Sequence, residues 1–381
     1  MARLGDVCTI SSSNVSMLDD KVWLLNLDMV EQQTGNIISY NYVGNDELNG
    51  SIIQFDTTNV LYSKLRPNLN KVVIPDRGGF ATSEMLPLKP NGNVLSREYL
   101  AAYLRSDAFV SWAVSKTAGA KMPRLGTKVL LDKEIPIPPL EEQRKIAEQL
   151  DKVSDLIAKR RAQLDKLDLL VKARFVEMFC EERATENWPV VTIADISTDM
   201  RTGPFGSALR HSEFVESGVF VLGIDNAVEN RFSYSRMRYI TEEKYQQLKR
   251  YTVKPGDVII TIMGTVGRSA VIPEDIPKAI NTKHLACLTI DKTRALPTFV
   301  CCAFQMHPDI RRQLTRQVKG AIMDGLNLTI IKKISLKLPS MDRQNDFCKF
   351  VEQTEQIKNS ISHSLDKLEM LKKALMQKYF G

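Results

Sequence analysis

Several features that would assign a chemistry are missing from this sequence of 381 residues. No apolar run approaches the roughly 18 residues that a membrane-spanning helix needs, and the first residues lack the apolar core of a signal peptide, so we expect a cytoplasmic protein. The six cysteines include no C-x-x-C pair and the four histidines lie far apart, which argues against structural zinc and predicts reduced, buried thiols. The sequence also lacks the phosphate loop G-x-x-x-x-G-K-[ST], the G-x-G-x-x-G turn and the Asn/Asp-Pro-Pro-aromatic tetrapeptide of adenine methyltransferases. It therefore predicts a chain without a catalytic centre, a metal or a cofactor of its own.

Charge is distributed unevenly along a composition that is ordinary for a folded protein. The chain is 43% hydrophobic and 25% charged, and it is long enough for two or three domains. Residues 181–340 hold 22 basic and 17 acidic residues, and residues 57–140 hold 12 basic and 6 acidic residues. Each globular part thus has a basic region, which is typical of proteins that bind a polyanion.

The chain contains a long internal repeat. Residues 119–180 and 320–381 align without a gap at an offset of 201. Each copy begins Gly-Ala-x-Met, passes a Pro and then Gln143 or Gln344, and closes on a long charged segment that ends near Phe179 or Phe380. A repeat of this length predicts two copies of a whole module, each a globular part followed by a helix. Two similar modules indicate a ligand with two similar sites.

The two charged segments carry a heptad pattern. Apolar residues recur at alternating steps of four and three, which is the seam of a coiled coil. The residues that we expect to pack in it are Ile146, Leu150, Val153, Ile157, Leu164, Leu167, Val171, Phe347, Val351, Ile361, Leu365, Leu368 and Leu375. Lys358 and Lys372 interrupt the second seam, where the neighbouring Ile357 and Leu371 are expected to widen the apolar face. A helix bundle or a homodimer is the alternative, but the duplication favours an intramolecular antiparallel pair, and about 39 residues at ~1.5 Å each span roughly 58 Å.

The globular parts have the pattern of mixed α and β structure. Short β-rich runs at 71–75, 219–222 and 257–262 are separated by Gly, Pro and Asn, and helical segments are predicted at 98–115 and 298–317. A strand that carries residues 61–63 corresponds to one that carries 259–261. We therefore predict an α+β fold with two mixed α/β domains at 1–140 and 181–340. Two long antiparallel coiled-coil helices at 141–180 and 341–381 would separate them, in a pseudo-twofold repeat.

Several short motifs occur together in a characteristic order. They are Pro138-Pro139-Leu140-Glu141-Glu142-Gln143-Arg144-Lys145-Ile146-Ala147, its echo Pro339-Ser340-Met341-Asp342-Arg343-Gln344, the segment Thr202-Gly203-Pro204-Phe205-Gly206-Ser207, the segment 251–258, and the end Lys-Lys-Ala-Leu-Met-Gln-Lys-Tyr-Phe at 372–380. Over its entire length the chain resembles the DNA-specificity subunits of Type I restriction-modification systems.

This resemblance implies a function without catalysis. In that family two target-recognition domains each read one half of a split DNA sequence, and two helices fix the gap between the halves. The partners implied are double-stranded DNA, two methylation subunits that modify an adenine in each half-site, and ATP-driven translocase-nuclease subunits. S-adenosylmethionine, ATP and magnesium would belong to those partners. The two domains differ between residues 10 and 60 and between 200 and 255, which predicts an asymmetric target.

Candidate DNA contacts are basic and amide side chains beside turns, together with a Gly-rich loop at 202–207 whose backbone can approach a DNA strand closely. In the first domain they are Lys64, Arg66, Asn68, Asn70, Lys71, Lys121 and Arg124. In the second domain they are Arg201, Thr202, Gly203, Phe205, Gly206, Ser207, Arg210, Arg231, Arg236, Arg238, Arg268, Lys283, His284 and Lys319.

Two other functions are compatible with the same sequence. A DNA-binding or architectural protein outside restriction would bind DNA without methylation partners. A scaffold without a DNA role would show binding that is independent of salt, whereas DNA binding weakens linearly in log affinity against log salt.

Overall fold

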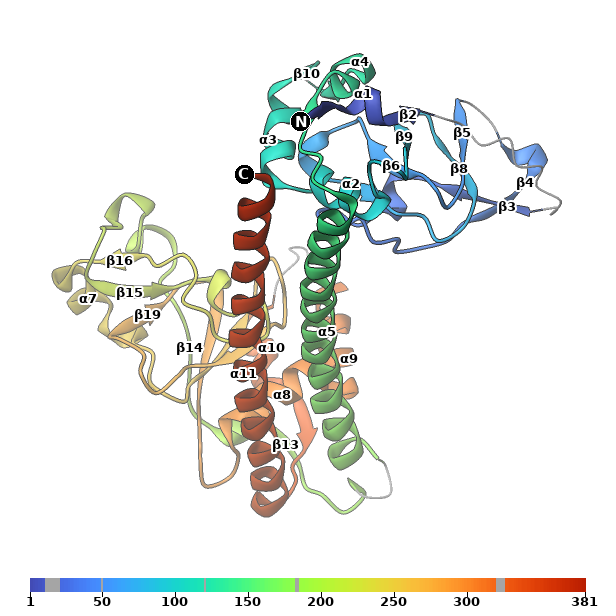
Figure 1. The fold of residues 1–381 in the computed structure, drawn as a ribbon. Coiled ribbons are helices and arrows are strands. Elements are labelled where there is room, and N and C mark those ends of the chain that lie inside the picture. The colour runs from blue at the N-terminus through green and yellow to red at the C-terminus, as the bar shows by residue number, and fades with distance from the viewer. Residues whose placement is uncertain (11–20, 49–50, 120, 182–184, 320–325) are drawn as a thin grey trace. The chain divides into compact units, whose positions relative to one another are not determined.

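The computed structural model describes residues 1–10, 21–48, 51–119, 121–181, 185–319 and 326–381 (Figure 1). For Asn45, Ser207 and residues 317–319 only the backbone is described. The chain forms two compact units. Unit 1 comprises Met1–Ala162 and Ser362–Gly381, and unit 2 comprises Gln163–Ile361.

Unit 1 contains two four-stranded sheets. The first is antiparallel in the order β2-β9-β6-β7, with β2 Cys8–Ile10, β9 Met85–Pro90, β6 Val60–Ser63 and β7 Val72–Val73. The second has the order β4-β3-β8-β5, with β4 Tyr42–Gly44, β3 Lys21–Leu25, β8 Gly79–Thr82 and β5 Ile52–Phe55. In it β3 and β8 are parallel. Short pairs join β1 Ala2–Arg3 to β12 Glu134–Ile135, and β10 Thr117–Ala118 to β11 Arg124–Leu125. The helices of this globular part are α1 Leu4–Val7, α2 Arg97–Leu104, α3 Asp107–Ser115 and α4 Thr127–Leu131.

Unit 2 repeats this topology. Its antiparallel sheet has the order β14-β20-β17-β18, with β14 Ser197–Thr202, β20 Leu285–Ile290, β17 Val258–Thr261 and β18 Ser269–Val271. Its second sheet has the order β16-β15-β19, with β16 Tyr239–Ile240, β15 Val219–Leu222 and β19 Ala279–Asn281, and β15 and β19 are parallel. The pair β13 Val190–Thr192 and β21 Ser335–Lys337 matches β1 and β12. The helices are α7 Glu242–Leu248, α8 Pro297–Met306, α9 Pro308–Lys319 and α10 Leu328–Lys333. The duplicated module, including the match of 61–63 in β6 with 259–261 in β17, is confirmed.

The two helical segments predicted at 98–115 and 298–317 are each two helices instead of one. In unit 1 the chain breaks at Ser106, whose hydroxyl caps α3 by accepting a hydrogen bond from the Phe109 backbone N at 3.2 Å. In unit 2 it breaks at His307, which precedes Pro308 and has extended backbone angles. The strand predicted at 71–75 is shorter than expected, because only Val72 and Val73 pair with β6.

The long helices α5 Leu140–Phe179 and α11 Met341–Phe380 run antiparallel within each unit (Figure 1). In unit 1 the Tyr379 hydroxyl lies 2.8 Å from Gln149 Oε1, and Arg161 forms an ion pair of 2.7 Å with Glu369. The residue number of the partner on α11 falls as that on α5 rises, as expected for antiparallel helices. In unit 2 the Lys358 Nζ lies 2.8 Å from Asp168. The predicted seam residues are buried at Ile146, Leu150, Val153, Ile157, Val171 and Phe347, and half-buried at Leu164, Leu167, Val351, Ile361, Leu365, Leu368 and Leu375.

Ile357 and Leu371, which were expected to widen the apolar face of the second seam, are not buried in it. Ile357 and Leu371 are 52% and 46% exposed. The basic residue beside Ile357 stays at the seam because acidic groups neutralise it: the Lys358 Nζ lies 2.7 Å from Glu355 as well as close to Asp168. Lys358 can therefore occupy a seam position without an apolar neighbour replacing it there.

Each unit attaches its helices in the same two ways. Gln143 and Gln344, at the starts of α5 and α11, are completely buried. Gln143 accepts a hydrogen bond from the Ser96 backbone N and donates to the carbonyls of Val94 and Pro138, and Gln344 makes the corresponding bonds to Leu296, Arg294 and Pro339. The ends of the helices insert a phenylalanine: Phe380 of α11 contacts Tyr99 in unit 1, and Phe179 of α5 contacts Phe299 in unit 2. Two pairs of residues shared by the repeats, Gln143 with Gln344 and Phe179 with Phe380, thus join the long helices to the domains.

Candidate nucleic-acid interface

In unit 1 the predicted DNA contacts at 64–71 and those at 121–124 come together through backbone hydrogen bonds. The segment that leaves β6 runs beside the β10–β11 hairpin, because the Arg66 backbone N donates to the Pro123 carbonyl at 2.8 Å and the Leu125 N donates to the Lys64 carbonyl at 2.9 Å. Lys121 is exposed at the tip of this hairpin. The Arg124 guanidinium is half exposed and pairs with Glu84 at 3.1 Å. The basic residues of this surface thus lie around one acidic side chain, that of Glu84.

The segment 64–71 divides its side chains between solvent and core. Arg66 and Asn68 are exposed, and Arg66 has a left-handed backbone with φ of 49°. Asn70 is 6% exposed and donates to the Arg105 carbonyl at 3.0 Å. The Lys71 Nζ donates to the Leu27 carbonyl at 2.5 Å, and burial lowers the pKa of Lys71. Asn70 and Lys71 therefore brace the loop, and Arg66 and Asn68 are left to meet a ligand.

In unit 2 the candidates gather where the parallel strands β15 and β19 end. The Thr282 backbone N donates to the carbonyl of Leu222, the last residue of β15, at 3.0 Å. A Cβ added to Gly203 would lie 2.1 Å from the Asn281 carbonyl, so the loop 203–207 packs on the same turn and needs glycine there. Lys283 is exposed and His284 is half-buried on this turn. Ligands of sheets with parallel strands commonly bind at this carboxyl edge.

Exposed side chains of several kinds surround the turn 282–284. Phe205 is 60% exposed, and it precedes Gly206, which has φ of +59°. Arg238 is 31% exposed and pairs with Asp225, which also lies 3.9 Å from Arg236. Burial lowers the pKa of His284, and the positive charges of Lys283 and Arg238 lower it further. A neutral imidazole beside two cations is suited to hydrogen bonding with a base edge or a phosphate.

The remaining candidates of unit 2 lie in different environments. Arg210 and Arg268 are exposed, and Arg231 is exposed in an ion pair of 3.0 Å with Glu229. Thr202 is half-buried at the end of β14. The side chains of Ser207 and Lys319 lie outside the described residues.

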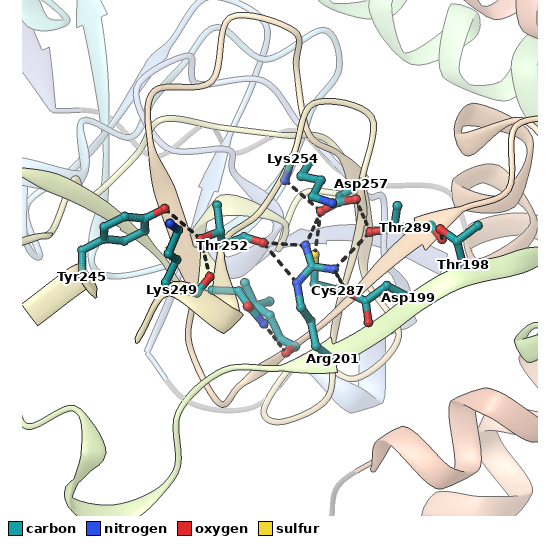
Figure 2. Close-up of polar contacts among 12 residues, drawn as sticks. Thr198, Asp199, Arg201, Tyr245, Lys249, Thr252, Lys254, Asp257, Cys287 and Thr289 are labelled. Atoms are coloured by element: carbon teal, nitrogen blue, oxygen red, sulfur yellow. Dashed lines mark hydrogen bonds and ion pairs between the residues drawn. The ribbon is translucent and has the colours of Figure 1, made fainter. Parts of the chain in front are cut away.

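Arg201 is held inside the domain (Figure 2). Its guanidinium is only 10% exposed and contacts Asp257 at 2.5 Å, Asp199 at 2.7 Å and the Thr252 carbonyl at 2.7 Å. Asp257, 1% exposed, also accepts hydrogen bonds from the Thr289 hydroxyl and the Lys254 backbone N. This network closes the turn 252–257, so we assign Arg201 to the fold and remove it from the candidate contacts.

Both units have the same set of backbone hydrogen bonds, here called the backbone frame, at one turn. This turn joins β8 to β9 in unit 1 and β19 to β20 in unit 2. The residue that follows β6 or β17, Lys64 or Ile262, donates its backbone N to the carbonyl of Glu84 or His284 at 3.0 Å. Its own carbonyl accepts a hydrogen bond of 2.9 Å from Leu125 or Leu326. Glu84 is therefore the equivalent of His284. Glu84 is absent from the predicted contacts because no acidic side chain was expected to contact DNA, although extending the repeat to the pair β9 and β20 would have aligned the two residues.

Neither a metal centre nor a membrane helix is found in the described part of the chain. No group of three or more His, Cys, Asp or Glu side chains is arranged to hold a metal ion among those residues. None of the helices described is both long and apolar enough to cross a bilayer. Burial raises the pKa of the Cys287 thiol well above its usual value, and the neighbouring Asp257 raises it further.

Two solved structures have the same fold as this chain. One comes from a study of complex assembly and conformational transition of the type I R-M system, with 17% identity and a TM-score of 0.62 over 100% of this chain and 96% of that chain. The other is the S subunit of a Type-I restriction-modification system from M. genitalium, with 14% identity and a TM-score of 0.65 over 100% and 95%.

Similar sequences and a family model agree with this fold. The EcoBI specificity subunit of Escherichia coli is 22% identical over 71% of this chain, a match that spans 63% of that relative's length. The MjaVIII specificity subunit of Methanocaldococcus jannaschii is 21% identical over 78% of this chain and 72% of its own length. The model of the Type I restriction modification DNA specificity domain matches residues 1–167 and 185–370. The chain therefore belongs to the Type I restriction-modification DNA specificity family.

Proposed function

We propose that this chain is the sequence-recognition subunit of a Type I restriction-modification complex. Residues 1–140 and 181–340 each read one half of a split DNA target, and the helices at 141–180 and 341–381 act as the spacer. The chain directs adenine methylation and restriction but performs neither, because methylation subunits and translocase-nuclease subunits supply the catalytic centres. We place the complex in the cytoplasm.

The observation that carries this proposal is one frame with two sets of side chains. Glu84 with Arg124 occupies the frame in unit 1, and His284 with Arg238 and Lys283 occupies it in unit 2. A carboxylate accepts from the amino group of cytosine, whereas arginine and lysine donate to guanine, so these turns are suited to different bases. This difference supports an asymmetric target.

The exposed residues Arg66, Asn68, Lys121 and Arg124 are the proposed contacts of unit 1. Those of unit 2 are the loop Gly203–Ser207 and the side chains of Arg210, Arg231, Arg236, Arg238, Arg268, Lys283, His284 and Lys319. Lys64 and Thr202 contribute at the edges of these surfaces. The basic side chains lie beside loops that follow strand ends, where backbone NH groups can also contact phosphates.

A duplicated apolar flank on the helices supports two copies of one partner. Leu156, Leu169 and Leu170 are 44%, 64% and 49% exposed, and the residues 201 positions later, Ile357, Met370 and Leu371, are 52%, 64% and 46% exposed. Each unit has three of the six. Leu156 and Leu371 in unit 1, and Leu170 and Ile357 in unit 2, immediately precede seam positions, so antiparallel pairing puts the two residues of each unit on the same flank of its helices. In unit 1 the ion pair of Arg161 and Glu369 lies on the opposite flank. We propose that the apolar flank of each unit binds one methylation subunit.

Adenine methylation mapped across the genome tests the recognition function. Cells that carry the methylation gene are compared with and without this chain, and a split motif that vanishes without the chain is the expected result. DNA binding with no methylation partner would indicate an architectural protein instead. Partner binding that does not depend on salt, with no DNA binding, would indicate a scaffold.

Charge insertion into one flank tests the partner sites. Native mass spectrometry of the complex should show that Leu156→Glu with Leu371→Glu removes one of two methylation subunits, and that Leu170→Glu with Ile357→Glu removes one as well. Lys166→Glu with Lys367→Glu changes exposed, repeat-equivalent residues and serves as the control. A full complement of methylation subunits on both flank variants would contradict the assignment.

A further inference from the structure

The helix α9 of unit 2 presents a basic face that is not among the sequence-predicted contacts. Arg311, Arg312, Thr315 and Arg316 line a surface hollow of about 310 Å³. All four are exposed, and their spacing places them on one side of the helix. Arg312 pairs with Asp309, and among the described residues Arg311 and Arg316 have no acidic side chain within ion-pair distance. The hollow therefore concentrates positive charge.

This helix is held firmly by its opposite face. Ile310 and Leu314 are buried in the core of unit 2. The Gln313 side chain donates to the Ser335 carbonyl at 2.8 Å and accepts from the Ser335 backbone N at 3.0 Å. The three arginines are thus displayed on a fixed support, which reduces the entropy that they lose when they bind a ligand.

The basic face continues the proposed reading surface. A Cβ added to Gly267 would lie 3.1 Å from Leu314 Cδ1 and 4.0 Å from Arg311 Nη1, so α9 stands against the turn that precedes Arg268. The same loop begins at Ile262, whose backbone N donates to the His284 carbonyl at 3.0 Å. Described residues therefore connect the turn 282–284, here called the reading turn of unit 2, to α9 without a break.

Unit 1 lacks this feature at the equivalent helix. The buried pair Phe109 and Ala113 of α3 matches the buried pair Ile310 and Leu314 of α9. In that alignment Val110, Ser111, Val114 and Ser115 replace the four residues that line the hollow. The arginine face therefore belongs to unit 2 alone and is not part of the duplicated framework.

Resting on the proposed function, we propose that Arg311, Arg312 and Arg316 form a clamp for DNA phosphates that flank the half-site read by unit 2. Guanidinium groups bind phosphate oxygens in bidentate geometry, and such contacts position DNA without reading its sequence. The face has no large apolar side chain of the kind that forms the centre of a protein interface, so DNA fits it better than an acidic protein does.

The test is the salt dependence of duplex binding by the full chain in complex with its methylation subunits. The variant Arg311→Gln/Arg312→Gln/Arg316→Gln is compared with wild type on two 40-bp duplexes, one that carries the mapped split target and one with scrambled sequence. Each lost phosphate contact lowers the slope of log affinity against log salt by about 0.9, so the slope should fall by up to about 2.7. We expect affinity to fall on the order of tenfold, and equally on both duplexes, since phosphate contacts carry no sequence information.

Two variants control for charge and geometry. Arg144→Gln/Lys145→Gln/Lys152→Gln removes the same charge from exposed positions of α5 and should leave the slope unchanged. Arg311→Lys/Arg312→Lys/Arg316→Lys keeps the charge and should restore most of the slope. Equal losses in the glutamine variants of α9 and α5 would reduce the effect to net charge and overturn the clamp.

Other outcomes also decide the matter. An unchanged slope in the α9 variant, or a loss confined to the specific duplex, would overturn the phosphate clamp while the proposed function stands. Unchanged DNA binding together with a lost methylation subunit would overturn it in favour of an acidic protein surface. If wild type binds neither duplex with a salt-dependent affinity, the proposed function itself fails.

Discussion

His307 illustrates how one side chain can couple the fold of unit 2 to pH. It is 7% exposed, and its Nδ1 accepts a hydrogen bond of 3.2 Å from the Asp309 backbone N at the start of α9. Burial lowers the pKa of His307, Arg312 acts in the same direction, and Asp309 opposes them. Its folded-state pKa therefore lies below the unfolded value near 6.5, and the unfolded chain takes up the proton first as the pH falls.

We predict that unit 2 loses stability as the pH falls below about 6.5, with a slope of up to about 1.4 kcal/mol per pH unit from this one site. Thermal unfolding between pH 7.5 and 5.5 measures it. His307→Asn retains an acceptor for the start of α9 without a titrating group, so its stability should depend less on pH. The exposed His363→Asn is the control. Equal pH dependence in His307→Asn and wild type would exclude this origin.

Arg201 marks the limit of residue-level inference from sequence. It precedes a Gly-rich loop, as a DNA contact should, yet it lies in a buried network with Asp257 and Thr252. Sequence identifies a basic residue near a turn. Whether its side chain points into the domain depends on the strand register, which distant residues determine. The same reason separates Asn70 and Lys71, which brace their loop, from Arg66 and Asn68, which are exposed.

At the scale of elements, the buried glutamines join each long helix to its own domain. Gln143→Leu leaves the Ser96 backbone N and the carbonyls of Val94 and Pro138 without their partner, and Gln344→Leu does the same in unit 2. Each unsatisfied buried group costs about 1–3 kcal/mol, so we predict a loss on the order of 3 kcal/mol confined to one unit. Hydrogen exchange followed by mass spectrometry would locate the loss.

The exposed Gln356→Leu on α11 is the control for these two variants. It should leave the exchange of both units unchanged. If Gln143→Leu lowered protection in both units equally, the two units would unfold as one, and the local role of the glutamines would be refuted.

The elements were the most predictable level of this molecule. The heptad pattern and the repeat predicted both long helices, and Gln143 and Gln344 stood out because they recur at the repeat offset. The breaks at Ser106 and His307 were missed, since a cap or a proline inside an apolar run acts through local backbone geometry that periodicity does not report. Glu84 was missed because acidic side chains were not among the residue types expected to contact DNA.

At the scale of the whole molecule, two units with one frame and different side chains should read independently. Each reading turn belongs to one unit, and Glu84 and His284 occupy the same place in the two frames. A substitution at one turn removes contacts to the bases of one half-site and leaves the other frame unchanged. The split target should therefore change in one half at a time.

We predict that Glu84→Gln relaxes or changes one position in one half-site and that His284→Gln does so in the other half-site. A base contact is worth about 1–3 kcal/mol, so discrimination at that position should fall roughly 10- to 100-fold. Methylation mapping in cells that carry each variant measures both halves and the gap in one experiment. Lys89→Gln, on β9 of unit 1 and outside the reading turn, is the control and should leave the motif intact. A variant that altered both halves, or the gap between them, would show that the two units do not read as separate modules.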